Sequence, residues 1–213
     1  MLFFLSMGFP LHLAALHLMA LVLAISFHEA AHGYAAHKLG DSTARNLGKI
    51  TLDPRAHFSR MTIFMMLIFP IAFGSCPINP RNFRKPARDE RLVAAAGPFS
   101  NLLLGFACFF VMSAIAYFFI PGGSALAVPW GQLATTLIWI NVWLFILNLI
   151  PIPPLDGFKI ISFLLPWKTR ESFYRIEQYG FLILILIINF FRYPLNIAMT
   201  AIIAGMSGLI PWA

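Results

Sequence analysis

The chain has 213 residues, of which 60% are hydrophobic and only 11% are charged, and its formal net charge is +7. Soluble domains carry about 25% charged residues, and the mean hydropathy here is +0.80, so the polar groups are too few to cover a globular surface. This composition excludes a soluble protein and indicates an integral membrane protein in a lipid bilayer. The basic residues occur in short loops between apolar runs, which argues against nucleic acid as a partner.

The first apolar run, residues 10–37, is long enough to cross a bilayer, which takes about 20 residues. No basic segment precedes it, and it is too long for the apolar core of a signal peptide, so we expect a retained span. Its second half contains the sequence HEAAH at residues 28–32, which places ionisable side chains in an otherwise almost uncharged segment. Such side chains are costly inside a membrane and by default mark a functional site.

The HEAAH sequence has the spacing of a zinc-binding helix. His28 and His32 are four residues apart, so they lie on the same helix face, one turn from each other. Both imidazoles can reach one zinc ion, and Glu29 beside them can act as a general base. A lone histidine would more often be a hydrogen-bonded core residue, but two that enclose a glutamate favour a metal site. His12 and His17 in the same span receive no assigned role.

The polar segment after the first span predicts a small β-hairpin. Asn46-Leu47-Gly48 is a turn signal, and short runs with β-branched residues flank it within residues 43–52. His57, farther along this basic loop, could approach the site, but we expect it to be an exposed loop residue.

Residues 61–75 form a short apolar run with basic clusters on both sides. If this run crossed the bilayer, one cluster would face outside, whereas Lys and Arg are enriched in cytoplasmic loops. We therefore expect a re-entrant segment that returns to the side it left; a true span with a mixed charge pattern is the alternative. The N-terminus and the uncharged loop 121–131 then lie outside, and the basic loops face the cytoplasm.

The next run, residues 92–120, carries Gly97-Pro98 close to its start. The proline predicts a break before the helix, with Asn101 in the first turns of the span that follows. We expect Asn101 to form hydrogen bonds between helices. A role close to the site or the substrate is the alternative.

The run at residues 132–150 leads into a proline-rich bend that ends at Asp156. Three prolines break the helix and place the carboxylate at the cytoplasmic edge of the membrane, at the depth expected for His28 and His32. A catalytic zinc ion takes three protein ligands and keeps a fourth position for water, so Asp156 is the candidate third ligand. A carboxylate that caps the helix near Gly157 is the alternative.

The last two apolar runs, 177–191 and 194–211, are borderline in length because Arg192 and Pro194 separate them. Together, the runs predict an all-α polytopic membrane protein with about five to six transmembrane helices. A re-entrant segment and a small β-hairpin complete the expected fold near the active site.

We find no internal repeat and no low-complexity linker, so we expect one integral membrane domain over residues 1–213. Its core covers residues 10–165, and additional C-terminal helices lie at 174–211. The charge pattern predicts a multi-pass protein of the plasma membrane with its active site toward the cytoplasmic side. The sequence does not indicate the oligomeric state.

Four stretches resemble, in order, the motifs of the site-2 proteases, which are intramembrane zinc metalloproteases: HEAAHGYAAHKLGD, ARNLGKITLDPRAH, AAAGPFSN and NLIPIPPLDG. The chain is most similar to the compact members without a PDZ domain, over about residues 15–165. The resemblance implies that His28, His32 and Asp156 are the zinc ligands and that Glu29 is the catalytic acid/base.

The resemblance also implies that Asn148 holds the substrate or the oxyanion, and that the hairpin at 44–53 is the substrate-binding edge strand. Lys49 stands where an arginine is common in the family, and Asp53 stands where an asparagine is common. Neither residue belongs to the zinc set.

The expected reaction is the hydrolysis of a peptide bond in a transmembrane protein or peptide. One zinc ion per chain would activate water and polarise the carbonyl, while Glu29 takes the water proton. The substrate would unwind and pair with an edge strand. A non-catalytic metal-binding scaffold of the same fold is the alternative, although metal retention alone does not require Glu29. An ion transporter would be expected to show paired inverted half-helices, which are absent here.

Overall fold

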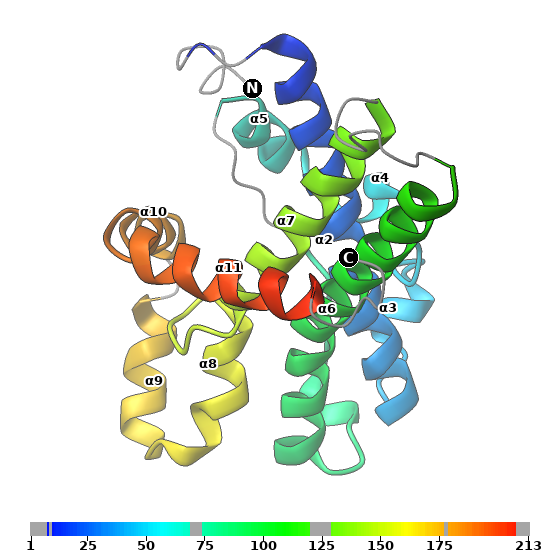
Figure 1. The fold of residues 1–213 in the computed structure, drawn as a ribbon. Helices are drawn as coiled ribbons and strands as arrows, with labels where there is room; N and C mark the ends of the chain where they lie inside the picture. Colours follow the sequence, from blue (N-terminus) through cyan, green and yellow to red (C-terminus); the bar gives the residue numbers. More distant parts are fainter. Residues whose placement is uncertain (1–7, 9, 69–73, 120–128, 177–178, 208–213) are drawn as a thin grey trace.

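Three long helices form the centre of this computed structural model, which describes residues 8, 10–68, 74–119, 129–176 and 179–207. They are α2 (Leu11–Leu39), α6 (Pro86–Phe119) and α7 (Pro129–Asn148). Each contains a stretch that is long and apolar enough to cross a membrane. They run in alternating directions, so the end of α2 and the start of α6 lie at the same end of the molecule (Figure 1).

Local signals in the sequence set the limits of these helices. α2 ends at Gly40, whose φ of 116° lies in the left-handed region that glycine adopts without strain. α6 begins with proline at its first position, and the Asp89 carboxylate accepts a hydrogen bond from the Lys85 N–H at 2.8 Å. α7 ends just before the proline-rich bend.

The predicted β-hairpin at residues 43–52 is wrong. This segment contains the helical turn α3 (Thr43–Asn46), and the described part of the chain contains no strand at all. The Asp41 carboxylate accepts a hydrogen bond from the Thr43 N–H at 3.1 Å, and the Lys49 N–H donates to the Ala44 carbonyl at 2.8 Å. These local bonds fold the segment onto itself and leave no paired strands.

The apolar run at 61–75 contains one short helix, α5 (Arg60–Ile68), which follows α4 (Pro54–His57). Nine residues of helix extend about 14 Å, less than half of the bilayer core of about 30 Å. The Ser75 N–H donates to the His57 carbonyl at 3.1 Å, so the residues on either side of the run lie together. Part of the run, residues 69–73, lies outside the described residues.

The expected break before Gly97-Pro98 is also wrong, because α6 continues through both residues. Proline lacks the N–H that an α-helix uses, yet membrane helices tolerate it where neighbouring helices and side chains satisfy the freed groups. The Ser100 hydroxyl donates to the Gly97 carbonyl at 2.7 Å. Asn101 consequently lies near the middle of α6 and not in its first turns.

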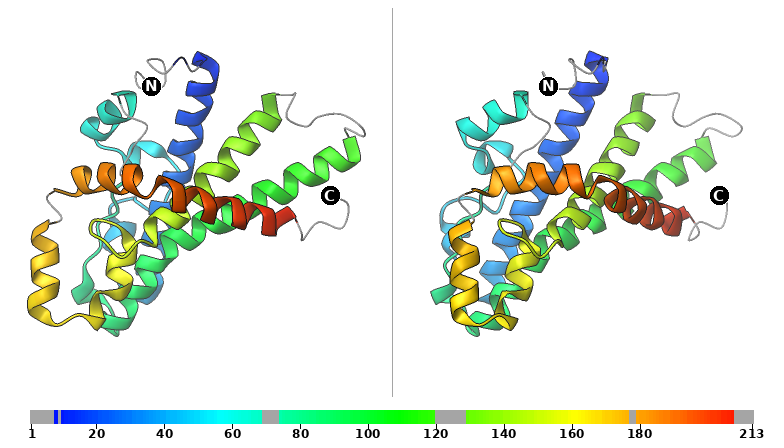
Figure 2. Two further views of the ribbon diagram at one scale, coloured as in Figure 1. Left: turned by 60° about the vertical axis from the view of Figure 1, so that its left-hand side comes forward. Right: turned by 90° about the vertical axis from the view of Figure 1, so that its left-hand side faces the viewer.

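In the described residues after α7, the elements are α8 (Asp156–Ile161), the 3-10 turn η3 (Ser162–Leu164), α9 (Trp167–Ile176), α10 (Gly180–Phe190) and α11 (Arg192–Ser207). Neither α10 nor α11 is long enough to span alone, and they meet at a 72° bend. Together they lie across α7 and α6 (Figures 1 and 2). The described residues thus provide three candidate spans, or four if the bent pair is one span, and do not support five to six.

α7 connects three of the hydrophobic clusters among the described residues. Ile140 and Leu144 pack with the middle of α2 and with Met66 of α5. Val142 packs with α6 and α11, and Leu147 packs with Leu155 and α10. Because α7 contributes to all three clusters, it fixes the position of the proline-rich bend relative to α2.

Candidate metal centre and pocket

Three predicted ligands lie together in the structure. The Asp156 Oδ2 atom is 3.0 Å from His28 Nε2 and 3.2 Å from His32 Nε2, and the two Nε2 atoms are 3.0 Å apart. All three residues are buried, and they form a group of ligand atoms that could hold one metal ion. Two ligands come from one helical face of α2, and the third comes from the first residue of α8.

Hydrogen bonds on the far side of each imidazole determine which nitrogen carries the proton. His32 Nδ1 lies 2.7 Å from the Val93 carbonyl, which can only accept, so this nitrogen donates. His28 Nδ1 lies 2.7 Å from Asn101 Oδ1, an acceptor because the Asn101 amide nitrogen donates to Asn141 Oδ1 and to a backbone carbonyl. Both neutral imidazoles therefore present an Nε2 lone pair to the Asp156 carboxylate.

This donor set fits a zinc ion. Bonds of about 2.0–2.1 Å in tetrahedral geometry place neighbouring ligand atoms about 3.3–3.4 Å apart. The observed separations of 3.0 to 3.2 Å are close to that value. Two imidazole lone pairs and a carboxylate that converge on one buried point repel one another unless a cation lies between them.

The surroundings keep Asp156 ionised. Burial alone raises the pKa of this carboxyl group, but positive charge beside it, from protonated imidazoles of His32 and His28 or from a metal ion in their place, lowers it by more. The Lys159 ammonium lies 3.8 Å from the other carboxylate oxygen, Oδ1. A metal ion and a lysine can thus share the two oxygens of one carboxylate.

α6 supports both histidines without contributing a ligand. A Cβ atom at Gly97 would lie 2.4 Å from His32 Nε2 and 2.6 Å from His28 Cε1. The helix therefore approaches the imidazoles closely only because this position has no side chain. The Val93 carbonyl and the Asn101 amide, one turn on either side, accept the two Nδ1 hydrogen bonds.

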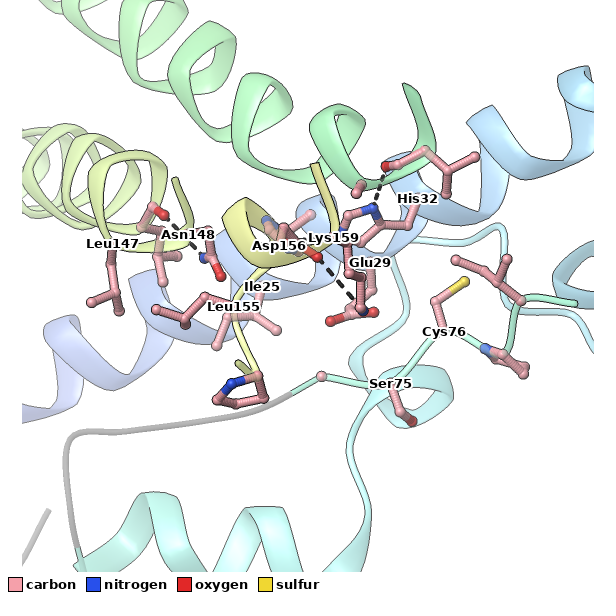
Figure 3. Close-up of a pocket in the computed structure, with 18 of the residues that line it drawn as sticks. Ile25, Glu29, His32, Ser75, Cys76, Leu147, Asn148, Leu155, Asp156 and Lys159 are labelled. Carbon is pink, nitrogen blue, oxygen red and sulfur yellow. Dashed lines mark hydrogen bonds and ion pairs between the residues drawn. The ribbon is translucent and has the colours of Figure 1, made fainter. Parts of the chain in front are cut away.

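A pocket of about 610 Å³ opens beside the three ligands, and Glu29 lies on its wall (Figure 3). A Cβ atom at Gly74 would come within 2.6 Å of the Glu29 carboxylate carbon, so the segment after residue 73 passes directly over this side chain. Glu29 does not belong to the ligand group. Its side chain nevertheless lines the same pocket as the three grouped residues.

Apolar and charged side chains both line the pocket, and Lys49, Glu90 and Lys159 are among the charged ones. Leu147 and Leu155 lie toward one side, and Lys159 lies toward the other (Figure 3). Cys76 also lines the pocket, but burial and the nearby Glu29 raise the pKa of its thiol to about 12. It therefore stays a neutral thiol, and it is not one of the grouped ligands.

Asn148 lies on the same pocket wall as Leu147 and Leu155, on the opposite side from Ser75 and Cys76 (Figure 3). Its amide nitrogen donates to the Leu144 carbonyl at 3.0 Å, which leaves one N–H available. It forms no hydrogen bond with the three ligands among the described residues.

The remaining histidines do not belong to the metal centre. His17 precedes His28 by eleven positions on α2, which corresponds to about 16 Å along the helix, and His12 lies farther away. The expectation that His57 is exposed is wrong: the side chain is 1% exposed, and its Nε2 donates to the Thr51 carbonyl at 2.8 Å.

The sequence interpretation missed two residues near the centre, Asn141 and Lys159. Asn141 is fully buried and links Asn101 to α7. An amide in an otherwise apolar span is a signal in itself, because such groups seek partners on other helices. Lys159, one turn after Asp156, could have been recognised as a neighbour from that helical spacing.

The fold and this site define a class of protein: a helical membrane protein with a buried His-His-Asp group that could hold a metal ion, beside a pocket of about 610 Å³. The chain belongs to peptidase family M50, the site-2 protease family, whose family model matches residues 16–122 and 112–191. It is therefore a membrane zinc metalloprotease, as the resemblance of its motifs implied.

Curated relatives agree with this assignment. The chain is 34% identical over 180 residues to the "Putative zinc metalloprotease YwhC" of Bacillus subtilis. This match covers 84% of this chain and 82% of the relative. The chain is 28% identical to the protein of Mycolicibacterium smegmatis named "Putative zinc metalloprotease Rip2", over 78% of this chain and 64% of that one. Rip2 of Mycobacterium tuberculosis is also 28% identical, over 84% of this chain and 69% of that protein. No solved structure matches significantly.

Proposed function

We propose that this protein hydrolyses peptide bonds in or near the transmembrane segments of membrane proteins, with His28, His32 and Asp156 as zinc ligands and Glu29 as general base. The observation that carries the proposal is the convergence of two imidazole lone pairs and a carboxylate at one buried point. That point adjoins a pocket of about 610 Å³ that is partly apolar.

Each residue of the site would have a separate role in the reaction. The three ligands hold the ion, which when bound supplies Lewis acidity that makes water nucleophilic near neutral pH. Glu29, beside the ligands, takes the proton from the attacking water and delivers it to the leaving amine. The hydrogen bonds from the Nδ1 atoms of the two histidines keep their Nε2 atoms oriented toward the ion.

Asn148 would assist at the substrate carbonyl. It lines the pocket, and one N–H of its amide is already used by the Leu144 carbonyl, so the other can donate to a substrate oxygen. A donor fixed by a helix end stabilises negative charge on that oxygen as the peptide bond is attacked.

The substrate must expose its backbone before hydrolysis, because an intact helix buries its peptide groups in internal hydrogen bonds. Since no hairpin forms at 43–52, we propose that the segment Gly74–Asn79 provides the pairing edge instead. It contains neither helix nor turn before the 3-10 turn η1 (Pro80–Asn82), and its first residues pass over Glu29. Pairing through the main chain favours weak sequence specificity and helix-breaking residues near the cut.

The apolar and charged side chains of the pocket suggest how the substrate lies. Its membrane part would occupy the side of Leu147 and Leu155, and the segment that leaves the bilayer would occupy the side of Lys159. We further propose that the protein lies in the plasma membrane with the side of Lys159 toward the cytoplasm. Residues 10–165 would form the catalytic core, and the helices of 174–211 would be additions to it.

The experiment compares purified wild-type protein with Glu29→Gln on a synthetic transmembrane peptide in detergent, with the zinc content measured for both. We expect cleavage to fall by about 10²–10⁴-fold, because the proton acceptor is lost. The zinc content should stay at about one per chain, because Glu29 is not a ligand. Glu171→Gln, a matched change on the exposed helix α9, should cleave normally.

Two outcomes would contradict the proposal. Unchanged cleavage by Glu29→Gln would show that Glu29 is not the general base. No cleavage by the zinc-loaded wild type on any transmembrane peptide would favour the non-catalytic scaffold.

A further inference from the structure

A second, shallower cavity lies away from the metal centre, between the first turns of α6 and the α8–η3 connection. It has a volume of about 340 Å³ and is lined by Arg88, Arg91, Leu92, Ala95, Ile160 and Phe163. None of these residues lines the catalytic pocket. The cavity is therefore not part of the proposed protease site.

The two arginines occupy one end of this groove. Arg88 and Arg91 are three residues apart, so they lie on the same face of α6. Arg91 donates through Nε to the Ala87 carbonyl, and its guanidinium lies 3.9 Å from the centre of the Phe163 ring. Arg88 Nε lies 3.5 Å from the Asp89 carboxylate. Within the described parts of the chain, no Nη atom of either arginine has a hydrogen-bond partner.

The rest of the groove is apolar and continues along the helix. Leu92 and Ala95 each lie one turn after one of the arginines, and Leu92 is 46% exposed. Phe99 and Leu103 follow at seven and eleven positions after Leu92, so they lie on the same face, and they are 54% and 68% exposed. This face of α6 thus carries two neighbouring guanidinium groups near its first turns. An exposed apolar stripe follows them, where the membrane-length stretch of the helix starts.

We propose that this groove binds an anionic glycerophospholipid of the surrounding bilayer, with the phosphate on Arg88 and Arg91 and an acyl chain along the stripe. Guanidinium groups bind phosphate oxygens in a bidentate manner, which matches the free Nη atoms. Basic pockets at the cytoplasmic ends of membrane helices are suited to anionic headgroups. The apolar stripe distinguishes a lipid from a free phosphate, because a free phosphate has nothing to place there.

The bound lipid would join α6, which packs against the two histidines, to the segment that follows Asp156. Its headgroup contacts α6, which supports the histidines, and the groove wall includes Ile160 and Phe163, which follow Asp156 in the chain. The inference does not depend on the proposed proteolysis.

The test uses the full chain with dioleoylphosphatidylglycerol or dioleoylphosphatidylcholine in detergent, and native mass spectrometry counts the bound lipids. Wild type should retain phosphatidylglycerol preferentially, and the double variant R88Q/R91Q should bind it about ten- to thirty-fold more weakly. R81Q/R84Q removes the same charge from the preceding loop and should bind normally. Phe163→Ala, which keeps both arginines, should weaken binding by a smaller factor.

Three results would overturn the inference. Equal retention of phosphatidylglycerol by wild type and R88Q/R91Q would show that the two arginines do not bind the lipid phosphate. Equal weakening in R81Q/R84Q would indicate attraction by total surface charge only. Thermal stabilisation of the wild type by millimolar inorganic phosphate that matches the effect of phosphatidylglycerol would indicate a simple anion site without a place for a chain.

Discussion

The orientation of His28 depends on a chain of amides that begins in α7. Asn141 donates to the Leu137 carbonyl at 2.8 Å and accepts from Asn101, which in turn accepts from His28. Because Asn101 and Asn141 are both fully buried, their donors and acceptors have no access to water. This arrangement leaves Asn101 only one way to face the imidazole, and it selects the His28 tautomer whose Nε2 can bind a metal.

At this scale we predict that Asn101→Ala weakens zinc binding by about 10–100-fold, since the partner that orients a metal-ligating histidine is lost. The measurement is the zinc dissociation constant, obtained by competition with a chelator. Asn141→Ala should have a smaller effect because His28 keeps its acceptor. Asn189→Ala, an exposed amide on α10, should have none. Unchanged zinc affinity in folded Asn101→Ala would refute this role.

At the scale of elements, two close contacts join parts of the chain that are far apart in sequence. α6 touches the imidazoles at Gly97, and the Asp41 carboxylate ties the end of α2 to the loop before α6. The carboxylate accepts from the Asn79 N–H at 2.7 Å and from the Asn82 amide at 2.8 Å, in addition to Thr43. These two contacts fix both flanks of the pocket.

We predict that Gly97→Ala loses zinc and destabilises the protein by about 1–3 kcal/mol, because the new methyl group overlaps both imidazoles. Zinc content and the thermal unfolding midpoint check this. The matched control is Gly205→Ala in α11, where nothing lies within 4 Å of the added Cβ. That variant should retain zinc and gain slight stability from the higher helix propensity of alanine. Full zinc occupancy in Gly97→Ala would contradict the close packing.

The Asp41 contact predicts a dependence on pH. Burial raises the pKa of this carboxyl group, but the hydrogen bonds from Thr43, Asn79 and Asn82 lower it by more, so its folded pKa lies below the ordinary 3.8. A lowered folded pKa contributes stability above the unfolded pKa, and this contribution is lost as the pH falls through the folded pKa.

We therefore predict that Asp41→Asn destabilises the protein by about 2–3 kcal/mol at neutral pH, since hydrogen bonds to a charged acceptor are lost. The difference from wild type should shrink as the pH falls below 3.8. Thermal unfolding in detergent at several pH values measures this. Asp53→Asn, at the exposed cap of α4, should show a much smaller difference. A difference that does not change with pH would rule out the ionised carboxylate as the cause.

At the scale of the whole molecule, basic residues gather where α2 ends and α6 begins, while the opposite ends of these helices carry none. α2, α6 and α7 alternate in direction, which agrees with one cytoplasmic and one outer end. The two flanks of the run at 61–75 meet through the bond from Ser75 to His57. We take this as support for a segment that enters the membrane and returns.

The corresponding prediction concerns labelling from each side of the membrane. On a background without Cys76 and Cys108, Asn79→Cys should react with an impermeant maleimide only from the cytoplasmic side. Leu126→Cys should react only from the outside, because the charge-poor loop follows an outward-running span. Labelling of both positions from one side would overturn the proposed arrangement.

The sequence predicted those features that depend on short spacing. The i, i+4 histidines and the proline-rich bend before Asp156 were sufficient to identify the residues that meet at the centre. The hairpin was wrong because Asp41 accepts from the Thr43 N–H at the start of the turn α3, and the same carboxylate is held by the Asn79 N–H, a distant contact that no local pattern reveals. The break at Pro98 was wrong because packing against α2 maintains the helix. Asn141 was missed because its role depends on the relative register of three helices.

The separation of the ligands along the chain has a consequence for biosynthesis. His28 and Asp156 are 128 positions apart, and the intervening residues include the helix that braces the imidazoles. A ribosome completes the histidine pair long before it adds the aspartate, so an unfinished polypeptide in the translocon has an incomplete ligand set. The three candidate ligands can therefore come together only after synthesis has passed Asp156.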